Sequence, residues 1–341
     1  MTNKRISSLE EQVQKIHKES VVIDALGGLG FLYSDILAGD INATHVTLCA
    51  RNYEGLGYVL DQITRYYSLI EMAAPDRVML VEEAQDILKA KREGKLGIIF
   101  GFQEGSILGE NKTLLPILHK LGVRIIQLTY NEANLLGCGS LEPNDTGLTS
   151  LGIQVINAMN RLGIVVDLSH LGYRTNRDAI EVSEDPVVFT HANPLALKNV
   201  PRNKPDELIR MVAEKGGVMG LTPYAPFCKS TPGKRPTLED FLDQIDYVIQ
   251  LVGIDHVGIG TDKFEGRMAE EQYIKHPPRD PKKIETPWGE QSYVEGFSHI
   301  SQFSRITAGL LKRGYSDEDC AKIIGGNFHS VFQKVWKKPG F

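Results

Sequence analysis

The stretch over residues 163–203 limits the possible folds more than any other part of this chain. It contains two short apolar runs rich in β-branched residues, and each run ends in a histidine, His170 or His191. About ten residues with a helical pattern separate the runs, which is typical of parallel strands joined by a crossover helix. Because the carboxyl ends of parallel barrel strands meet at one face, we expect the two histidines to lie close together.

These histidines have two interpretations. A single histidine after a strand is more often a hydrogen-bonding residue of the core or rim than a metal ligand. Two histidines at the same topological position on successive strands are a natural pair of imidazole ligands for zinc. The residues alone leave both interpretations open.

The alternation of strand and helix patterns extends over most of the chain. Strand patterns occur at residues 20–24, 45–52, 96–104, 123–131, 164–170, 187–191, 216–224 and 255–262. Helical patterns occur at residues 56–72, 76–93, 112–121, 148–161, 205–215 and 237–252, and there is no hairpin signal. This pattern predicts an α/β fold, a single-domain (β/α)8 TIM barrel, and its even spacing disfavours the rival doubly wound sheet. The glycine-rich ALGGLG segment lacks the GxGxxG spacing of a dinucleotide site.

The expected organisation is an N-terminal helix over residues 1–19 followed by a barrel over residues 20–335. The segment 264–297 is rich in Pro, Lys and Glu, and we interpret it as a lid-like loop over the barrel mouth.

Charge and cysteine content exclude several classes of partner. The chain has 341 residues, a net charge of −5 and no basic run, which argues against nucleic acid and anionic membranes as partners. The four cysteines are scattered, form no CxxC motif and indicate a reducing compartment. The first residues lack the apolar region of a signal peptide, and no apolar run reaches the ~18–20 residues of a membrane span. We therefore expect a cytoplasmic protein.

Other polar residues follow strands at the same expected face. Asp262 closes the eighth strand, where a carboxylate that faces two histidines fits metal-assisted hydrolysis; a helix N-cap or a salt bridge with Lys263 is the alternative. Arg202 follows the sixth strand and suits a substrate carboxylate, or is an ordinary loop arginine. Tyr130 ends the fourth strand, where its hydroxyl can donate to an oxyanion or can simply be buried.

Longer motifs give the chain a resemblance to a known family: GFQEGSI, LTYNEANLLG, EPNDTGLTSLG, NRLGIVVDLSH, PVVFTHANPLAL, PRNKPDELIRMVAEKGGVMGL, HVGIGTDKFEG and IIGGNF. Over about residues 20–335, the chain resembles the membrane (renal-type) dipeptidases, metallopeptidases built on amidohydrolase-like barrels. The resemblance implies hydrolysis of dipeptides with two zinc ions. It assigns His170 and His191 to one zinc of the pair and Asp262 to the catalytic proton. It assigns Arg202, with the adjacent Asn203, to the substrate carboxylate.

Three positions depart from the family pattern. The family's first strand ends in a DGHND-like stretch whose histidine and second aspartate bind the other zinc, and Leu26 and Gly28 stand there in this chain. The metal-bridging glutamate falls on Gln103, and Glu104 beside it faces the opposite way unless the strand bulges. The family's oxyanion-binding histidine falls on Tyr130.

This set of side chains predicts one zinc ion at most. His170 and His191 are the expected ligands, and Gln103 and Asp24 are weaker candidates. Because neutral ligands hold two dications poorly, a second zinc is not expected.

The function expected from these residues is dipeptidase-like hydrolysis of a dipeptide or another small carboxylate-bearing amide, with Asp262 and Tyr130 as catalytic groups. Two alternatives remain open. One is a metal-independent enzyme on the same barrel that acts on another small acid, and the other is a non-catalytic ligand-binding relative. A homodimer is expected from the family alone.

Overall fold

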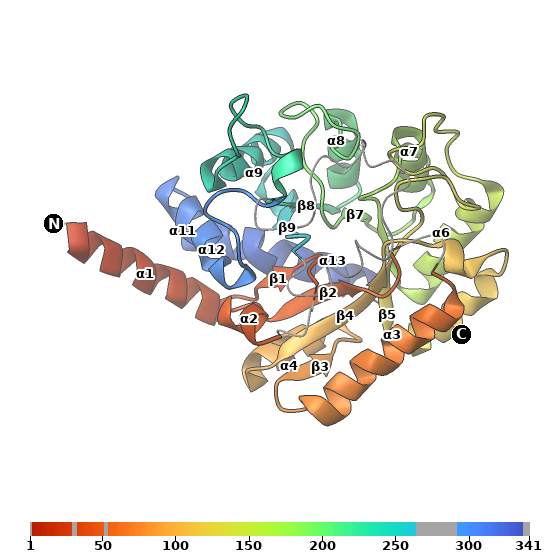
Figure 1. Ribbon diagram of the computed structural model, residues 1–341, viewed down its shortest axis with the longest axis horizontal. Helices are drawn as coiled ribbons and strands as arrows, with labels where there is room; N and C mark the ends of the chain where they lie inside the picture. Colours follow the sequence, from red (N-terminus) through yellow and green to blue (C-terminus); the bar gives the residue numbers. More distant parts are fainter. Residues whose placement is uncertain (1, 29–32, 51–53, 264–291, 337–341) are drawn as a thin grey trace.

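Eight parallel strands form a barrel in the computed structural model, which describes residues 2–28, 33–50, 54–263 and 292–336 (Figure 1). The barrel strands are β1 (Ile23–Asp24), β2 (Ala43–Thr47), β4 (Leu96–Phe102), β5 (Val123–Gln127), β6 (Val165–Asp167), β7 (Val188–Phe189), β8 (Val218–Leu221) and β9 (Val257–Ile259). Each pairs in parallel with the next one, and each overlaps one of the eight predicted strand patterns. The prediction of a single-domain (β/α)8 barrel is confirmed.

The barrel closes between its last and first strands. The backbone N–H of Ala25 donates to the carbonyl of Ile259 at 3.0 Å, and Gly27 forms a parallel bridge with Lys263. Asp262 therefore lies at the seam of the barrel, next to the end of β1.

The sequence patterns did not predict one further strand. Strand β3 (Val78–Leu80) pairs in parallel with β4, off the barrel path. The prediction of a single helix over residues 76–93 is therefore wrong in its first part. Helix α4 (Ala84–Glu93) begins only after Glu83, which forms a capping box with Asp86. A three-residue strand is too short for its period to be recognised.

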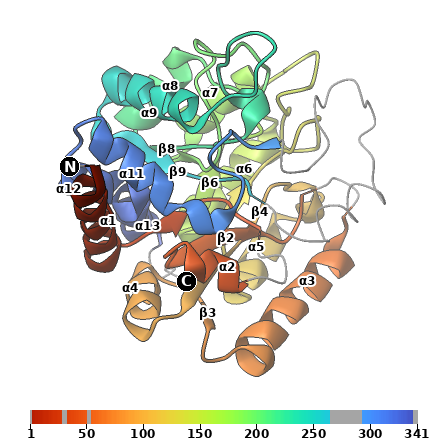
Figure 2. The same ribbon diagram turned by 60° about the vertical axis from the view of Figure 1, so that its left-hand side comes forward.

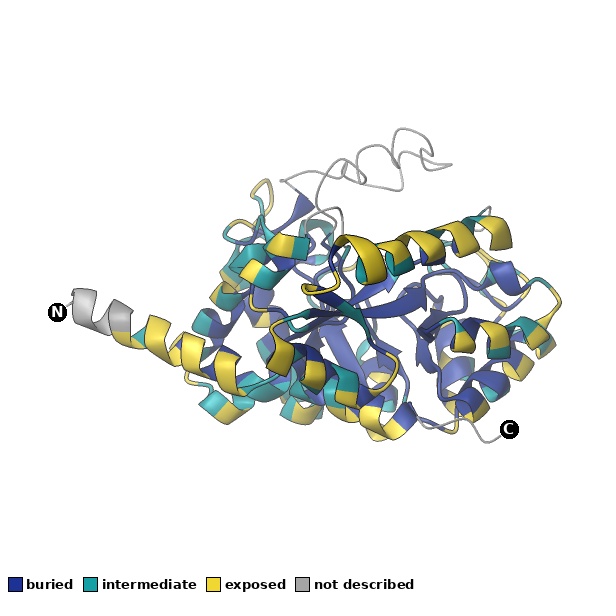
Figure 3. Cartoon of the chain, turned by 90° about the horizontal axis from the view of Figure 1, so that it is seen from below, coloured by how far each residue is buried: buried dark blue, intermediate teal, exposed yellow. Residues whose placement is uncertain are grey.

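Helices surround the barrel and connect its strands (Figure 2). The described helices are α1 (Thr2–Glu19), α2 (Tyr33–Ala38), α3 (Leu56–Ser68), α4, α5 (Leu115–Lys120), α6 (Ser150–Leu162), α7 (Tyr173–Val182), α8 (Asp206–Glu214), α9 (Leu238–Val252), α11 (Ser304–Lys312), α12 (Asp317–Ala321) and α13 (Asn327–Val335). Helix α1 packs against α11 and α12. Burial is concentrated in the strands and on the inner faces of the helices (Figure 3). Among the described residues, none of the helices combines the length and apolar character needed to cross a bilayer.

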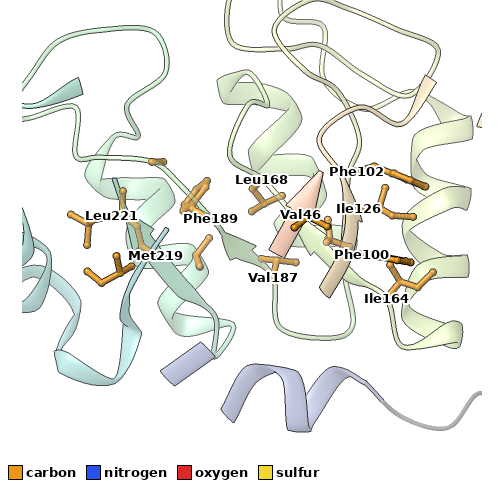
Figure 4. Close-up of a cluster of buried hydrophobic side chains, with 14 of the residues drawn as sticks. Val46, Phe100, Phe102, Ile126, Ile164, Leu168, Val187, Phe189, Met219 and Leu221 are labelled. Atoms are coloured by element: carbon orange, nitrogen blue, oxygen red, sulfur yellow. The ribbon is translucent and has the colours of Figure 1, made fainter. Parts of the chain in front are cut away.

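Two apolar clusters fill the fold. One lies between the strands and the surrounding helices and contains the side chains labelled in Figure 4, such as Phe100, Ile126 and Leu168. The other is built from alternate strand residues together with α13. Phe328 of α13 lies 2.4 Å and 3.0 Å from the points where a Cβ would stand on Gly258 and Gly220, so these strands need glycine there.

This arrangement leaves the carboxyl ends of the strands for polar side chains. Strand residues of one parity, such as Ile99 and Ile125, belong to the cluster that contains α13. Because side chains alternate along a strand, the later residues of the same parity, Gln103 and Gln127, face the same interior. Most of the proposed lid, residues 264–291, lies outside the described residues.

Candidate functional site

The two histidines meet across the ends of neighbouring strands. His170 follows β6 and His191 follows β7, and both side chains are buried. Their Nε2 atoms lie 2.9 Å apart. Burial, and then the charge of Arg202, hold the pKa of His191 well below its usual value, so this ring is neutral at physiological pH.

The other ring nitrogens of the two histidines have partners of different kinds. Nδ1 of His170 lies 2.8 Å from Oδ1 of Asn131, in the loop after β5. Nδ1 of His191 lies 2.8 Å from the hydroxyl of Thr190, the residue before it. Asn131 and Thr190 did not emerge from the sequence analysis, since a loop amide and a strand-end hydroxyl carry no recognisable pattern.

Gln103 brings its side-chain amide to the same point. Its Nε2 lies 3.2 Å from Nε2 of His191 and 3.4 Å from Nε2 of His170. Rotation of the terminal amide by 180° exchanges its nitrogen and oxygen, so the same side chain can offer an acceptor there. Two imidazole rings and one amide thus converge at one point.

Glu104 does not enter this cluster. Its carboxylate accepts hydrogen bonds from the backbone N–H groups of Ser106 and Tyr130, both at 2.8 Å, and from the amide of Asn134. The side chain therefore fixes the loops after β4 and β5, in agreement with the expected alternation along the strand.

The spacing of the two histidine nitrogens is compatible with binding to a shared metal ion. Two nitrogens bound to one tetrahedral zinc at Zn–N ~2.0–2.1 Å lie about 3.3 Å apart, close to the 2.9 Å between the histidine nitrogens. At the two positions where the resemblance places ligands of a second ion, Leu26 is a fully buried apolar residue and Gly28 has no side chain. Within the described part of the chain, no group of three or more His, Cys, Asp or Glu residues is arranged to hold a metal.

Arg202 is bonded to the backbone at both histidine-bearing strand ends. Its guanidinium donates from Nη1 to the backbone carbonyl of Ser169 and from Nη2 to that of His191 at 3.5 Å. The guanidinium carbon lies 5.3 Å from the ring centre of Phe227, a cation–π distance. Burial lowers the pKa of Arg202, and the nearby Tyr130 opposes this effect. Arg202 is therefore a buried cation beside the histidines, not an ordinary loop arginine.

Tyr130 covers one of the histidines. Its ring stacks on that of His170, with 3.9 Å between ring centres and 22° between planes. Tyr130 also counteracts the effect of burial on the pKa of Arg202, so it lies close to both the histidine and the arginine.

Asp262 stands at the barrel seam in a left-handed backbone conformation, with φ of 52°. Its N–H donates to the carbonyl of Leu26 at 2.8 Å, and its own carbonyl accepts from the hydroxyl of Tyr293. Burial raises the pKa of the Asp262 carboxyl to about 7, against the opposing charge of Arg202. A carboxyl group with this pKa can exchange a proton near neutral pH.

Two predicted site residues are engaged away from the histidines. Asp24 accepts from the backbone N–H and the hydroxyl of Thr261, at 2.7 Å and 2.6 Å, and burial raises its pKa to about 7. Asn203 donates from its amide to the carbonyls of Lys198 and Phe227, at 2.9 Å and 3.0 Å. These contacts support roles in fixing the Asp262 turn and the Arg202 loop, respectively.

The interior below the histidine pair is polar. Gln127 of β5 donates to the carbonyl of Gln103 and accepts from the backbone N–H of His170 at 3.2 Å. His45 of β2 is fully buried, with Nδ1 at 2.9 Å from the carbonyl of Ala25. Its Nε2 lies 2.2 Å from the point where a Cβ would stand on Gly101, so only glycine leaves room for this ring.

Comparison with known sequences gives a family and relatives. The model of the membrane dipeptidase family, peptidase family M19, matches residues 32–277 and 284–338. The dipeptidase verJ of Clonostachys rogersoniana is 31% identical over 83% of this chain and 66% of its own length. The dipeptidase tcpJ of Claviceps purpurea is 29% identical over 81% of this chain and 58% of its own length. The chain spans 57–66% of the length of four such curated relatives.

The solved structure of an amidohydrolase from Pseudomonas aeruginosa is 35% identical to this chain, with a TM-score of 0.86. The match covers 95% of this chain and 99% of the solved one. The similarity therefore extends over the whole barrel.

Proposed function

Because this chain belongs to the membrane dipeptidase family, peptidase family M19, we propose that it hydrolyses the amide bond of a dipeptide or another small amide that bears a carboxylate. The observation that supports this proposal most is the position of Arg202. Its guanidinium is anchored on the backbone carbonyls of Ser169 and His191. A substrate carboxylate bound there would lie next to the histidine pair.

The metal in this proposal is one zinc ion. His170, His191 and the side-chain oxygen of Gln103, after rotation of its amide, would bind it. Zinc in such a place supplies Lewis acidity, which polarises a carbonyl oxygen and lowers the pKa of water.

The other side chains of the site have separate roles in the proposed reaction. Asp262 takes the proton of the attacking water and returns it to the leaving amine, which its pKa of about 7 permits. The hydroxyl of Tyr130 donates to the oxygen that gains negative charge. Arg202 orients the substrate through its carboxylate, and Asn203 fixes the loop that carries Arg202.

A metal-independent enzyme is the second candidate, and one contact favours it. As oriented in the structure, the NH2 group of Gln103 has one N–H for each of the two Nε2 atoms, at 3.2 Å and 3.4 Å. The amide then satisfies both imidazoles without an ion, and Asp262 and Tyr130 are the acid–base groups that remain.

Metal analysis and turnover, measured together, test the proposal. Protein purified without chelators or a metal-binding tag is analysed for zinc and assayed with free and C-terminally amidated dipeptides, beside the His170→Ala/His191→Ala double variant. One zinc per chain that the double variant loses, with chelator-sensitive cleavage of the free dipeptides, is the expected result. Turnover without metal would support the second candidate. If the protein turned over none of these small amides even after zinc had been added back, the proposal of amide hydrolysis would be refuted.

A further inference from the structure

The carboxyl group of Asp167 is the centre of a buried hydrogen-bond cluster behind His191. Its Oδ1 accepts from the backbone N–H and the hydroxyl of Ser169, at 3.0 Å and 2.6 Å, and from the N–H of Thr190 at 3.0 Å. Its Oδ2 accepts from the hydroxyl of Thr190 at 2.7 Å. Both O–O distances are those of strong hydrogen bonds to a carboxylate. The protons of both hydroxyls therefore point at Asp167.

This arrangement determines which nitrogen of His191 bears the proton. A threonine hydroxyl has one proton to donate, and the hydroxyl of Thr190 gives it to Asp167. Towards Nδ1 of His191, 2.8 Å away, the same hydroxyl can only accept. Nδ1 of His191 is therefore protonated, and the Nε2 of the neutral ring carries a lone pair.

His170 reaches the same state through a different partner. Its Nδ1 lies 2.8 Å from the amide oxygen of Asn131, and an amide oxygen can only accept. The neutral form of His170 therefore directs the lone pair of its Nε2 at the same point as His191, where the amide of Gln103 also lies. Of the two partners, Asn131 and Thr190, it is Thr190 whose hydroxyl donates to a carboxylate, that of Asp167.

We infer that Asp167, acting through the hydroxyl of Thr190, is a positioning residue that keeps His191 protonated at Nδ1 and its Nε2 open as a ligand atom. The role in metal binding rests on the proposed function, whereas the position of the proton is a property of the metal-free chain. This relay is the chain of hydrogen bonds from Nδ1 of His191 through the Thr190 hydroxyl to Asp167. Without it, Nε2 of His191 would bear the proton and donate a hydrogen bond to Nε2 of His170, 2.9 Å away. The two histidines would then bond to each other instead of to an ion.

The position of the proton can be read directly. Metal-free protein labelled with 15N-histidine at pH 8 gives ring 15N shifts that separate a protonated from an unprotonated nitrogen, with the His191 signals assigned by their loss in His191→Gln. Wild type should show a protonated Nδ1. Thr190→Val, which removes the hydroxyl at nearly unchanged volume, should move the proton to Nε2. Ser169→Ala is the matched control. The hydroxyl of Ser169 donates to Asp167, lies 3.1 Å from the Thr190 hydroxyl and accepts from the backbone N–H of His191, but it has no hydrogen bond to Nδ1, so the variant should keep the wild-type proton position.

Zinc affinity is the second readout. Competition with a chelating dye should show about 10- to 100-fold weaker binding by Thr190→Val than by wild type, the usual effect of losing the partner of a ligating histidine. A protonated Nε2 in wild type, or an unchanged proton position in Thr190→Val, overturns the inference even where zinc binds. If Thr190→Val does not fold, the wild-type spectrum alone decides. Absence of zinc binding by wild type would remove the zinc part of the proposed function, and the spectra would still test the relay.

Discussion

Nε2 of His170 and Nε2 of His191 lie 2.9 Å apart at the carboxyl end of the barrel, with the amide of Gln103 facing both. None of the three side chains is a carboxylate. The histidines expected of a metal centre are therefore present, but the negatively charged ligands that a pair of metal ions would need are absent from this point.

Restoring one negative charge should strengthen metal binding. Gln103→Glu is expected to raise the affinity for zinc at least about tenfold, because attraction between a carboxylate and a dication at a few ångströms exceeds ~1.4 kcal/mol even at an effective dielectric constant of about 20. Titration with a competing chelator measures the change. Glu104→Gln is the control: it should lower the free energy of unfolding by about 1–3 kcal/mol, because the amide cannot accept all three bonds, and leave zinc affinity unaltered. Equal zinc affinity of wild type and Gln103→Glu would exclude Gln103 from the site.

Asp262 should set the pH dependence of turnover. The proposed general base acts in its deprotonated form, so kcat/KM is expected to rise as the pH increases through about 7, the pKa to which burial raises the Asp262 carboxyl. Asp262→Asn should reduce kcat by about 10²–10⁴-fold. The measurement is a rate profile from pH 5 to 9. A wild-type profile that is flat across this interval would assign the proton transfer to another group.

Asp24 should make the protein less stable at high pH. Its folded pKa of about 7 lies above the usual 3.8, so the fold favours the protonated form. The resulting stability is fully present below about pH 4 and is lost as the pH rises through 7, by about 4 kcal/mol at most. Asp24→Asn cannot ionise and should therefore gain stability relative to wild type between pH 5 and pH 8. Urea unfolding at both values measures this gain, and a difference that does not change with pH would contradict it.

Arg202 should determine the preference for substrates with a free carboxylate. Arg202→Lys keeps the charge but replaces the planar guanidinium by a single ammonium nitrogen, which cannot pair bidentately with a carboxylate, so KM for a free dipeptide is expected to rise roughly tenfold or more. The C-terminally amidated dipeptide, which lacks the carboxylate, should lose much less. Parallel steady-state assays of the two substrates give the comparison. Equal losses for both would mean that Arg202 acts only through the backbone of the histidines.

Two variants of Tyr130 separate the role of its ring, which stacks on His170, from the role of its hydroxyl. Tyr130→Phe retains the ring on His170 and removes only the hydroxyl, so a kcat about 10²–10³-fold lower is expected with the stack intact. Tyr130→Leu removes the stack as well and should also lower the melting temperature. Full activity of the phenylalanine variant would leave the hydroxyl without a role in catalysis.

The barrel was predictable because its strands are short apolar runs of regular spacing. The same periodicity misassigned the segment around Val78, because a three-residue strand ahead of a helix merges with the helical pattern. The convergence of His170 and His191 also followed from topology, since residues after neighbouring parallel strands must meet.

The direction of individual side chains was harder to predict. Asp24 ends a strand as the histidines do, yet its carboxylate bonds to Thr261. Asp167 was overlooked because a carboxylate within an apolar run looks like part of a strand, although a buried acid needs partners and its four hydrogen bonds supply them. Such contacts depend on loop geometry, which local sequence patterns do not encode.

The ring of His45 occupies the space that any side chain on Gly101 would need. The two positions therefore cannot change independently during evolution. A smaller residue at 45 removes only one of two obstacles to a side chain at 101, because the backbone carbonyl oxygen of Ile125 lies 2.6 Å from the same Cβ position. Among relatives of this chain, a histidine at the first position should be inherited together with glycine at the second.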